Sequence, residues 1–111
     1  MTTNDTRLCG MLGFAMRAGK LVSGTEQVCL AMAKSGSKKP RLILICRNAS
    51  AATVKKLTVK AAYYHIPSRI LPMEADDLGA RLGKAHAPMC IAVTDDGFAR
   101  EIALALGTEI Q

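Results

Sequence analysis

The sequence has no tryptophan and only two phenylalanines and two tyrosines, and its apolar runs are short. Single-strand binders of the RRM or OB type stack bases on exposed aromatic rings. Phe14 and Phe98 both fall on expected core faces, so these classes are disfavoured. Runs such as Leu42–Cys46 are far shorter than the roughly 20 residues of a membrane-spanning helix. The first twenty residues also lack the pattern of a secretory signal. We therefore expect a cytoplasmic protein without membrane contact.

The motifs of the common enzyme classes are missing as well. The segment from Gly13 to Lys20 has the wrong spacing for a phosphate-binding loop. His65 and His86 have no nucleophile or carboxylate partner in their local sequence. We expect no catalytic residue, no cofactor and no metal. A small metal-dependent enzyme using Asp95 and Asp96 is the least favoured alternative, because aspartate after a strand more often caps a helix. The cysteines form no C-x-x-C pair and are expected to be reduced core residues: Cys9, Cys29, Cys46 and Cys90.

Charge is distributed unevenly along the chain. The 15 basic and 9 acidic residues give a net charge of +6. Residues 1–72 carry 12 Lys/Arg against 2 acids, or +10, whereas residues 73–111 carry 3 against 7, or −4. A positive field concentrated in one part of a molecule favours a polyanionic partner. The charge pattern therefore points to nucleic acid.

Short apolar segments alternate with segments of helical periodicity along the chain. The all-apolar run Leu42–Cys46 is typical of a strand buried on both faces. Ser50 is expected to cap a helix from Ala51 to Tyr63 or Tyr64, and Asp95 or Asp96 to cap the last helix. This alternation predicts a single α/β domain over residues 1–111, with helices on both faces of a largely parallel sheet. The other expected strands are Leu21–Ser23, Ser68–Leu71 and Met89–Thr94.

The turn before the second expected helix is the best candidate for a nucleic-acid contact. Gly24 lets the backbone approach a ligand closely, and the free amides at a helix start attract phosphate. Thr25, Glu26 and Gln27 supply polar groups that can reach base edges. Glu26 suits this role only if it accepts a hydrogen bond from a base donor such as cytosine N4. A simple helix cap is an equally good interpretation of these residues. Lys20, just upstream, is a candidate phosphate contact.

Several motifs, in the same order along the chain, resemble those of the bacterial YlxQ-like proteins. These belong to the superfamily of kink-turn-binding ribosomal proteins that includes archaeal L7Ae and eukaryotic L30e. The resemblance runs from about Leu8 to Leu106. Its motifs are Leu12–Gly24, Asn48–Ser50, Thr53, Lys55–Lys56, Thr58, Lys60, Tyr63–Pro67, Asp77–Gly79, Gly83–Lys84, Ala92–Asp95 and Gly97–Ala99.

The resemblance implies a three-layer α/β/α sandwich around a small mixed sheet of about four strands. It also implies that the start of the second helix enters the widened major groove of an RNA kink-turn. In this family a glycine is followed by a variable residue and two polar readers, which correspond here to Gly24, Thr25, Glu26 and Gln27. A lysine normally follows three positions later, where this chain has Leu30.

The family's second RNA-facing element corresponds to the loop from Gly83 to Met89. In that loop we expect Lys84 and His86 to contact phosphate, and Ala87 and Pro88, together with Met89, to pack on exposed bases.

Together these features predict a non-enzymatic, monomeric RNA-binding protein of ribosomal type. Its expected partner is structured RNA with a kink-turn or a similar bend, and ribosomal particles are a further expected partner. The runner-up is a ribosome-assembly or protein-interaction module of the same fold with weak affinity for RNA. The residues Glu26 and Leu30 favour this runner-up, because both depart from the family pattern.

Overall fold

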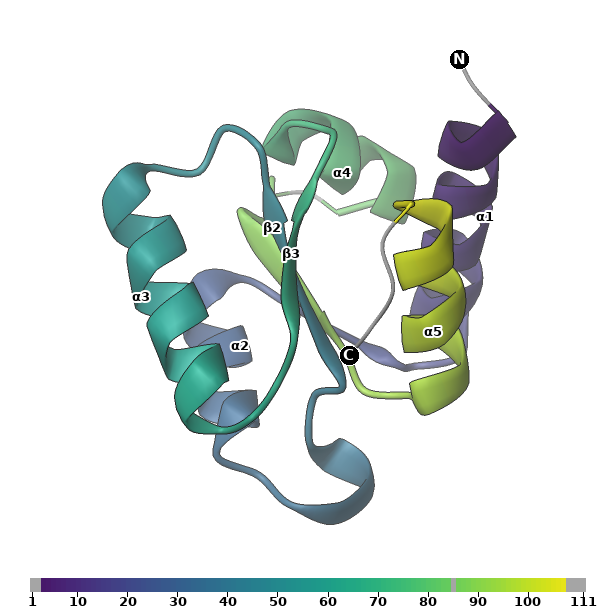
Figure 1. Cartoon of the computed structure of the whole chain (residues 1–111). Coiled ribbons are helices and arrows are strands. Elements are labelled where there is room, and N and C mark those ends of the chain that lie inside the picture. The colour runs from purple at the N-terminus through teal and green to yellow at the C-terminus, as the bar shows by residue number, and fades with distance from the viewer. Residues whose placement is uncertain (1–2, 85, 108–111) are drawn as a thin grey trace.

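The computed structural model describes residues 3–84 and 86–107, and Figure 1 shows the chain. The prediction of one domain over residues 1–111 therefore extends at both ends past the described part. The elements, in chain order, are α1 (Thr3–Arg17), β1 (Leu21–Ser23), α2 (Thr25–Met32), a short 3-10 helix η1 (Gly36–Lys38), β2 (Leu42–Cys46), α3 (Ala51–Tyr63), β3 (Ser68–Leu71), α4 (Ala75–Leu82), β4 (Cys90–Val93) and α5 (Asp96–Ala105).

The four strands form one sheet in the order β1-β4-β2-β3. Strand β4 is antiparallel to both β1 and β2, and only β2 and β3 are parallel. The mixed four-stranded sheet is confirmed, whereas the largely parallel sheet inferred from periodicity is wrong. A strand covered by helices on both faces is apolar throughout, whichever direction its neighbours run. Periodicity alone therefore cannot give strand direction.

Helices cover both faces of the sheet and make the predicted three layers. In Figure 1, α2 and α3 lie to one side of the sheet, and α1, α4 and α5 lie to the other. Each face of the sheet packs against its helix layer in a separate hydrophobic core, and alternate residues of β2 point into the two cores. Leu42, Leu44 and Cys46 pack toward α1, α4 and α5, while Ile43 and Ile45 pack toward α2 and α3. All five residues are fully buried. The same holds for Cys90–Val93 of β4, so the two central strands contact both helix layers.

Two helix starts expected from the sequence are confirmed. The Ser50 side chain accepts a hydrogen bond from the Thr53 backbone N–H at 3.2 Å, and Asp95 Oδ2 accepts one from the Phe98 N–H at 2.9 Å. Asp96 Oδ1 lies 3.5 Å from Arg41 Nε. Capping and ion pairing thus account for both carboxylates. Within residues 3–84 and 86–107, no cluster of three or more His, Cys, Asp or Glu side chains is placed to hold a metal ion.

One expectation about the aromatic residues is wrong. Phe14 is 55% exposed, and the Arg17 guanidinium lies 5.0 Å from the centre of its ring. The buried stripe of α1 is formed by Leu8, Leu12 and Ala15. Phe14 lies about 200° around the helix from Leu12, outside this stripe.

Across the described residues, no helix is both long and apolar enough to cross a membrane.

Candidate nucleic-acid interface

The start of α2 is built around Gly24. Its backbone has φ 96° and ψ 146°, a conformation that L side chains rarely adopt. The Gly24 N–H donates to the Cys90 carbonyl at 3.0 Å, which ties the turn to the start of β4. Among the residues that the structure describes, no side chain makes a capping hydrogen bond at the start of α2. Since the first amides of a helix have no partner within the helix, those of α2 are available to an acceptor from outside.

The three polar residues after Gly24 do not all face solvent. Thr25 is partly buried, and its Oγ1 lies 3.9 Å from the Cys90 Sγ. Glu26 and Gln27 are exposed. The helix therefore presents two polar side chains outward, while Thr25 contacts the underlying sheet.

The loop after α4 begins at Gly83, which ends the helix in a left-handed conformation with φ 66°. Lys84, His86 and Ala87 are exposed, and Ala85 lies outside the described residues. Pro88 is buried, so the prediction that it packs on exposed bases is not supported. A Cβ added to Gly79 would lie 3.3 Å from the Ala87 Cα and 3.4 Å from the Pro88 Cδ. Pro88 and Ala87 therefore pack the loop directly against α4 at Gly79.

The loop and the start of α2 meet in one hollow. Its volume is about 260 Å³, and its lining residues are Ser23, Gly24, Lys84, His86 and Pro88. Four of these were expected at the site from the sequence. Ser23 was not among the expected contact residues, although it is the first residue of the strand-to-helix turn, Ser23–Gln27, where a ligand site of an α/β sheet is expected. The hollow joins a cation, an imidazole and the uncapped start of a helix.

Two buried thiols, Cys46 and Cys90, contact the residues on the sheet side of this hollow. The Cys46 Sγ donates to the Pro88 carbonyl at 3.4 Å, and the Cys46 N–H donates to the Met89 carbonyl at 2.9 Å. Burial raises the pKa of Cys46 to about 11, and the neighbouring Cys90 adds to this rise. Burial also raises the pKa of Cys90 to about 11, against the lowering effect of its contact with Thr25. Both groups are therefore neutral thiols at physiological pH, with a packing role.

Lys20 lies away from this hollow. It precedes β1 whereas Gly24 follows it, so about 13 Å of extended strand separates the two residues. Lys20 instead lines a second cavity of about 380 Å³ together with Lys34, Lys38 and Thr94. The sequence did not indicate that these three lysines lie together, because they come from the turn before β1, the segment after α2 and η1.

Leu30, at the position of the family's lysine, is 64% exposed on α2. Glu26, Gln27 and Leu30 thus share the part of the helix that is accessible to a partner. In place of one positive charge, this chain presents an apolar side chain there.

Comparison with known proteins gives matches over most of the chain. Residues 6–103 match the ribosomal protein L7Ae/L30e/S12e/Gadd45 family. The chain is 38% identical over 92 residues to the RNA-binding protein YlxQ of Bacillus subtilis. The aligned segment covers 83% of this chain and 87% of that protein. It is 33% identical over 98 residues to the RNA-binding protein YlxQ of Enterococcus faecium. That alignment covers 88% of this chain and 89% of the relative.

Similar solved structures include one from a bacterium and one from a protist. A protein of unknown function from Bacillus halodurans is 33% identical and superposes with a TM-score of 0.81, covering 91% of this chain and 97% of that one. The 15.5kD RNA binding protein of Giardia lamblia superposes with a TM-score of 0.73 over 96% of this chain and 88% of its own. Its 13% identity shows a shared fold alone.

Proposed function

Because this chain belongs to the ribosomal protein L7Ae/L30e/S12e/Gadd45 family and is an RNA-binding protein rather than an enzyme, we propose that it recognises a kink-turn or a similarly bent RNA. The proposed contact surface consists of the start of α2 and the loop that follows α4. One chain is expected to bind one RNA in the cytoplasm, including RNA within ribosomal particles.

The hollow between Gly24 and the loop is the observation that carries this proposal. Gly24, Lys84 and His86 come from two separate parts of the chain and line the same hollow. A backbone that bends sharply brings phosphates close together, and their repulsion must be offset by cations and oriented amides. The uncapped amides of α2 and the Lys84 ammonium are arranged to provide both. A regular duplex offers no such concentration of phosphates.

Base recognition in this proposal belongs to the exposed side chains of α2. Gln27 can donate to and accept from a base edge, while the Glu26 carboxylate can only accept. Glu26 is therefore matched to an exocyclic amino group, such as cytosine N4 or guanine N2. The widened groove of a bent RNA is what allows a helix start to reach these edges, because the major groove of regular A-form RNA is deep and narrow.

The runner-up function is supported by Leu30. A leucine that is 64% exposed, at the position where the family has lysine, is better suited to an apolar partner surface than to a phosphate. In that case the same fold acts in ribosome assembly through protein contacts, with weak affinity for RNA.

Binding to two RNAs of equal length and composition tests the proposal. One carries a kink-turn and the other is a straight duplex, and affinity is measured by gel shift at 50 to 200 mM salt. We expect the kink-turn RNA to bind at least tenfold more tightly. Affinity should fall as salt rises, because neutralised phosphates release counterions. Equal affinity for both RNAs would contradict the proposal and favour the runner-up.

A second measurement uses Leu30. We expect Leu30→Lys to raise affinity for the kink-turn RNA about fivefold at low salt, which corresponds to about 1 kcal/mol. The added phosphate contact should also steepen the salt dependence by about 1 in the slope of log K against log salt. Leu30→Gln is the matched control, since it removes the leucine without adding charge. If Leu30→Gln strengthens binding as much as Leu30→Lys, charge at this position is not the cause.

A further inference from the structure

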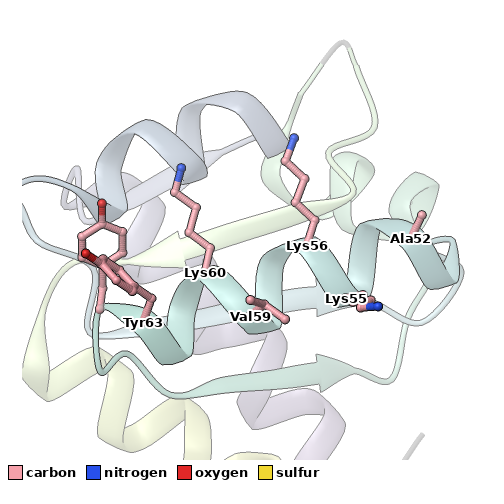
Figure 2. Close-up of a pocket in the computed structure, with 7 residues that line it drawn as sticks. Ala52, Lys55, Lys56, Val59, Lys60 and Tyr63 are labelled. Atoms are coloured by element: carbon pink, nitrogen blue, oxygen red, sulfur yellow. The ribbon is translucent and has the colours of Figure 1, made fainter.

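The outer face of α3 carries an open trough that the proposed kink-turn site does not use. Its volume is about 680 Å³. The residues that form it recur every three or four positions, so they share one side of the helix. Figure 2 shows this face, whose main lining residues are Lys55, Lys56, Val59, Lys60, Tyr63 and Tyr64.

Two tyrosines stand at the C-terminal end of this trough. Tyr63 is 76% exposed. The centres of the Tyr63 and Tyr64 rings lie 4.9 Å apart with their planes at 88°, an edge-to-face arrangement. Tyr64 is partly buried and packs against the core between the sheet and α2 and α3. Tyr64 therefore holds Tyr63 in place while most of the Tyr63 surface stays open to a ligand.

Three lysines line the rest of the trough, mostly through the carbon stems of their side chains, so its walls are largely apolar and the ammonium groups lie at its edge. The side chains of Lys56 and Lys60 extend in parallel to the same side of α3 (Figure 2). They are one turn apart, or about 6 Å along the axis. Helix α3 has no acidic residue in its sequence, so no carboxylate on α3 offsets these charges or that of Lys55. An anionic backbone lying along the helix would meet several cations in succession.

We propose that this α3 face binds a single-stranded RNA segment, with a base stacked on Tyr63 and phosphates beside Lys56 and Lys60. Grooves for single-stranded nucleic acid combine a positive track with an aromatic ring for stacking. An acidic protein segment would use the lysines but would gain little from the open ring. The inference does not depend on the kink-turn proposal, because α3 shares no residue with the hollow at Gly24.

Intrinsic fluorescence offers a direct test. The chain has no tryptophan, and Tyr63 and Tyr64 are its only tyrosines. All intrinsic tyrosine emission therefore comes from this face. Titration of the full chain with a single-stranded oligouridylate should quench this emission with saturation. Anisotropy of the end-labelled oligonucleotide should show about tenfold weaker binding for Tyr63→Ala and nearly unchanged binding for Tyr63→Phe, because base–aromatic stacking contributes about that much.

Matched controls separate this face from the rest of the molecule. Phe14→Ala removes an aromatic ring that is 55% exposed on α1, in the opposite helix layer, and should leave oligouridylate binding unchanged. Lys56→Gln with Lys60→Gln should weaken binding and flatten its salt dependence, whereas Arg81→Gln with Arg100→Gln should not. Gly24→Asp, which alters the α2 site, should retain oligouridylate binding.

Three results would overturn the inference. The first is equal affinity of the wild-type protein and the Tyr63→Ala variant for oligouridylate. The second is loss of oligouridylate binding in the Gly24→Asp variant. The third is an oligoglutamate of equal charge that binds as tightly as the RNA, which would identify an acidic protein surface as the partner. Failure of the kink-turn comparison with intact oligouridylate binding would reject the proposed function and leave this inference standing.

Discussion

Gly24→Asp is expected to reduce affinity for the kink-turn RNA by about 100-fold or more. The substitution adds a carboxylate at the uncapped start of α2, where the proposed phosphate contact occurs. Two unit charges 4 to 5 Å apart at an effective dielectric constant near 20 repel by about 3 to 4 kcal/mol. This energy corresponds to more than two orders of magnitude in the dissociation constant. Filter binding or anisotropy with the kink-turn RNA measures it.

Backbone strain requires a specific control for this experiment. Any side chain at residue 24 must adopt φ 96°, which costs about 1–3 kcal/mol of stability. Gly24→Asn imposes the same strain with nearly the same shape and without the charge. We expect Gly24→Asn to bind much more tightly than Gly24→Asp, with both variants folded by circular dichroism. If the two bind equally, backbone conformation rather than phosphate repulsion determines the result.

Alkaline pH is expected to destabilise the fold strongly. The Cys46 and Cys90 pKa values rise from about 9 in the unfolded chain to about 11 in the folded protein. Because the folded state favours the neutral thiols, their stabilising effect is complete below pH 9. It is lost as pH rises from 9 to 11, where the unfolded state releases protons and the folded state does not. At 1.36 kcal/mol per pKa unit the pair accounts for roughly 3 to 5 kcal/mol, less than two independent groups would, because part of the Cys46 rise comes from the charge of Cys90. Such a loss approaches the whole stability of many domains.

Denaturant unfolding at pH 8, 9, 10 and 11 in the presence of reductant measures this effect. Lysines and tyrosines also titrate in this range, so the comparison must cancel their contribution. The double variant Cys46→Ala and Cys90→Ala retains those groups. We expect it to be less stable than wild type at pH 8, because truncation leaves cavities, but to lose much less stability between pH 9 and 11. An equally steep decline in both proteins would show that the thiols are not responsible.

The elements that could be predicted from the sequence depend on local chemistry. Ser50 and Asp95 cap their helices because a short oxygen-bearing side chain accepts from an amide three residues later. The buried run Leu42–Cys46 is a strand, as predicted. Strand direction depends instead on how β4 inserts between β1 and β2. That arrangement arises from packing between segments that are distant in the sequence, so it cannot be predicted from local sequence periodicity.

The site could be predicted to a similar extent. The placement of Gly24 at the start of a helix and the exposure of Lys84 and His86 agree with the sequence analysis. Lys20 was expected near Gly24 because only three residues separate them, but those residues form an extended strand. Pro88 was expected to pack on exposed bases because the family resemblance places this loop at the RNA, yet the absence of a side chain at Gly79 lets the loop pack closely against α4. Such contacts are not visible in either segment alone.

The division of the sheet's two faces between helix layers has an electrostatic consequence. Lysines gather around α2 and α3, whereas α4 and α5 bring most of the described acidic residues to the other layer: Glu74, Asp76, Asp77, Asp96 and Glu101. Four arginines on α1, α4 and α5 offset part of this negative charge, namely Arg7, Arg17, Arg81 and Arg100, so the molecule has a modest charge dipole directed across its thickness. In the field of a polyanion, a dipole rotates during diffusion until its positive side leads. The protein should arrive at RNA already oriented, with the α2 and α3 layer forward, which raises the association rate before any specific contact forms.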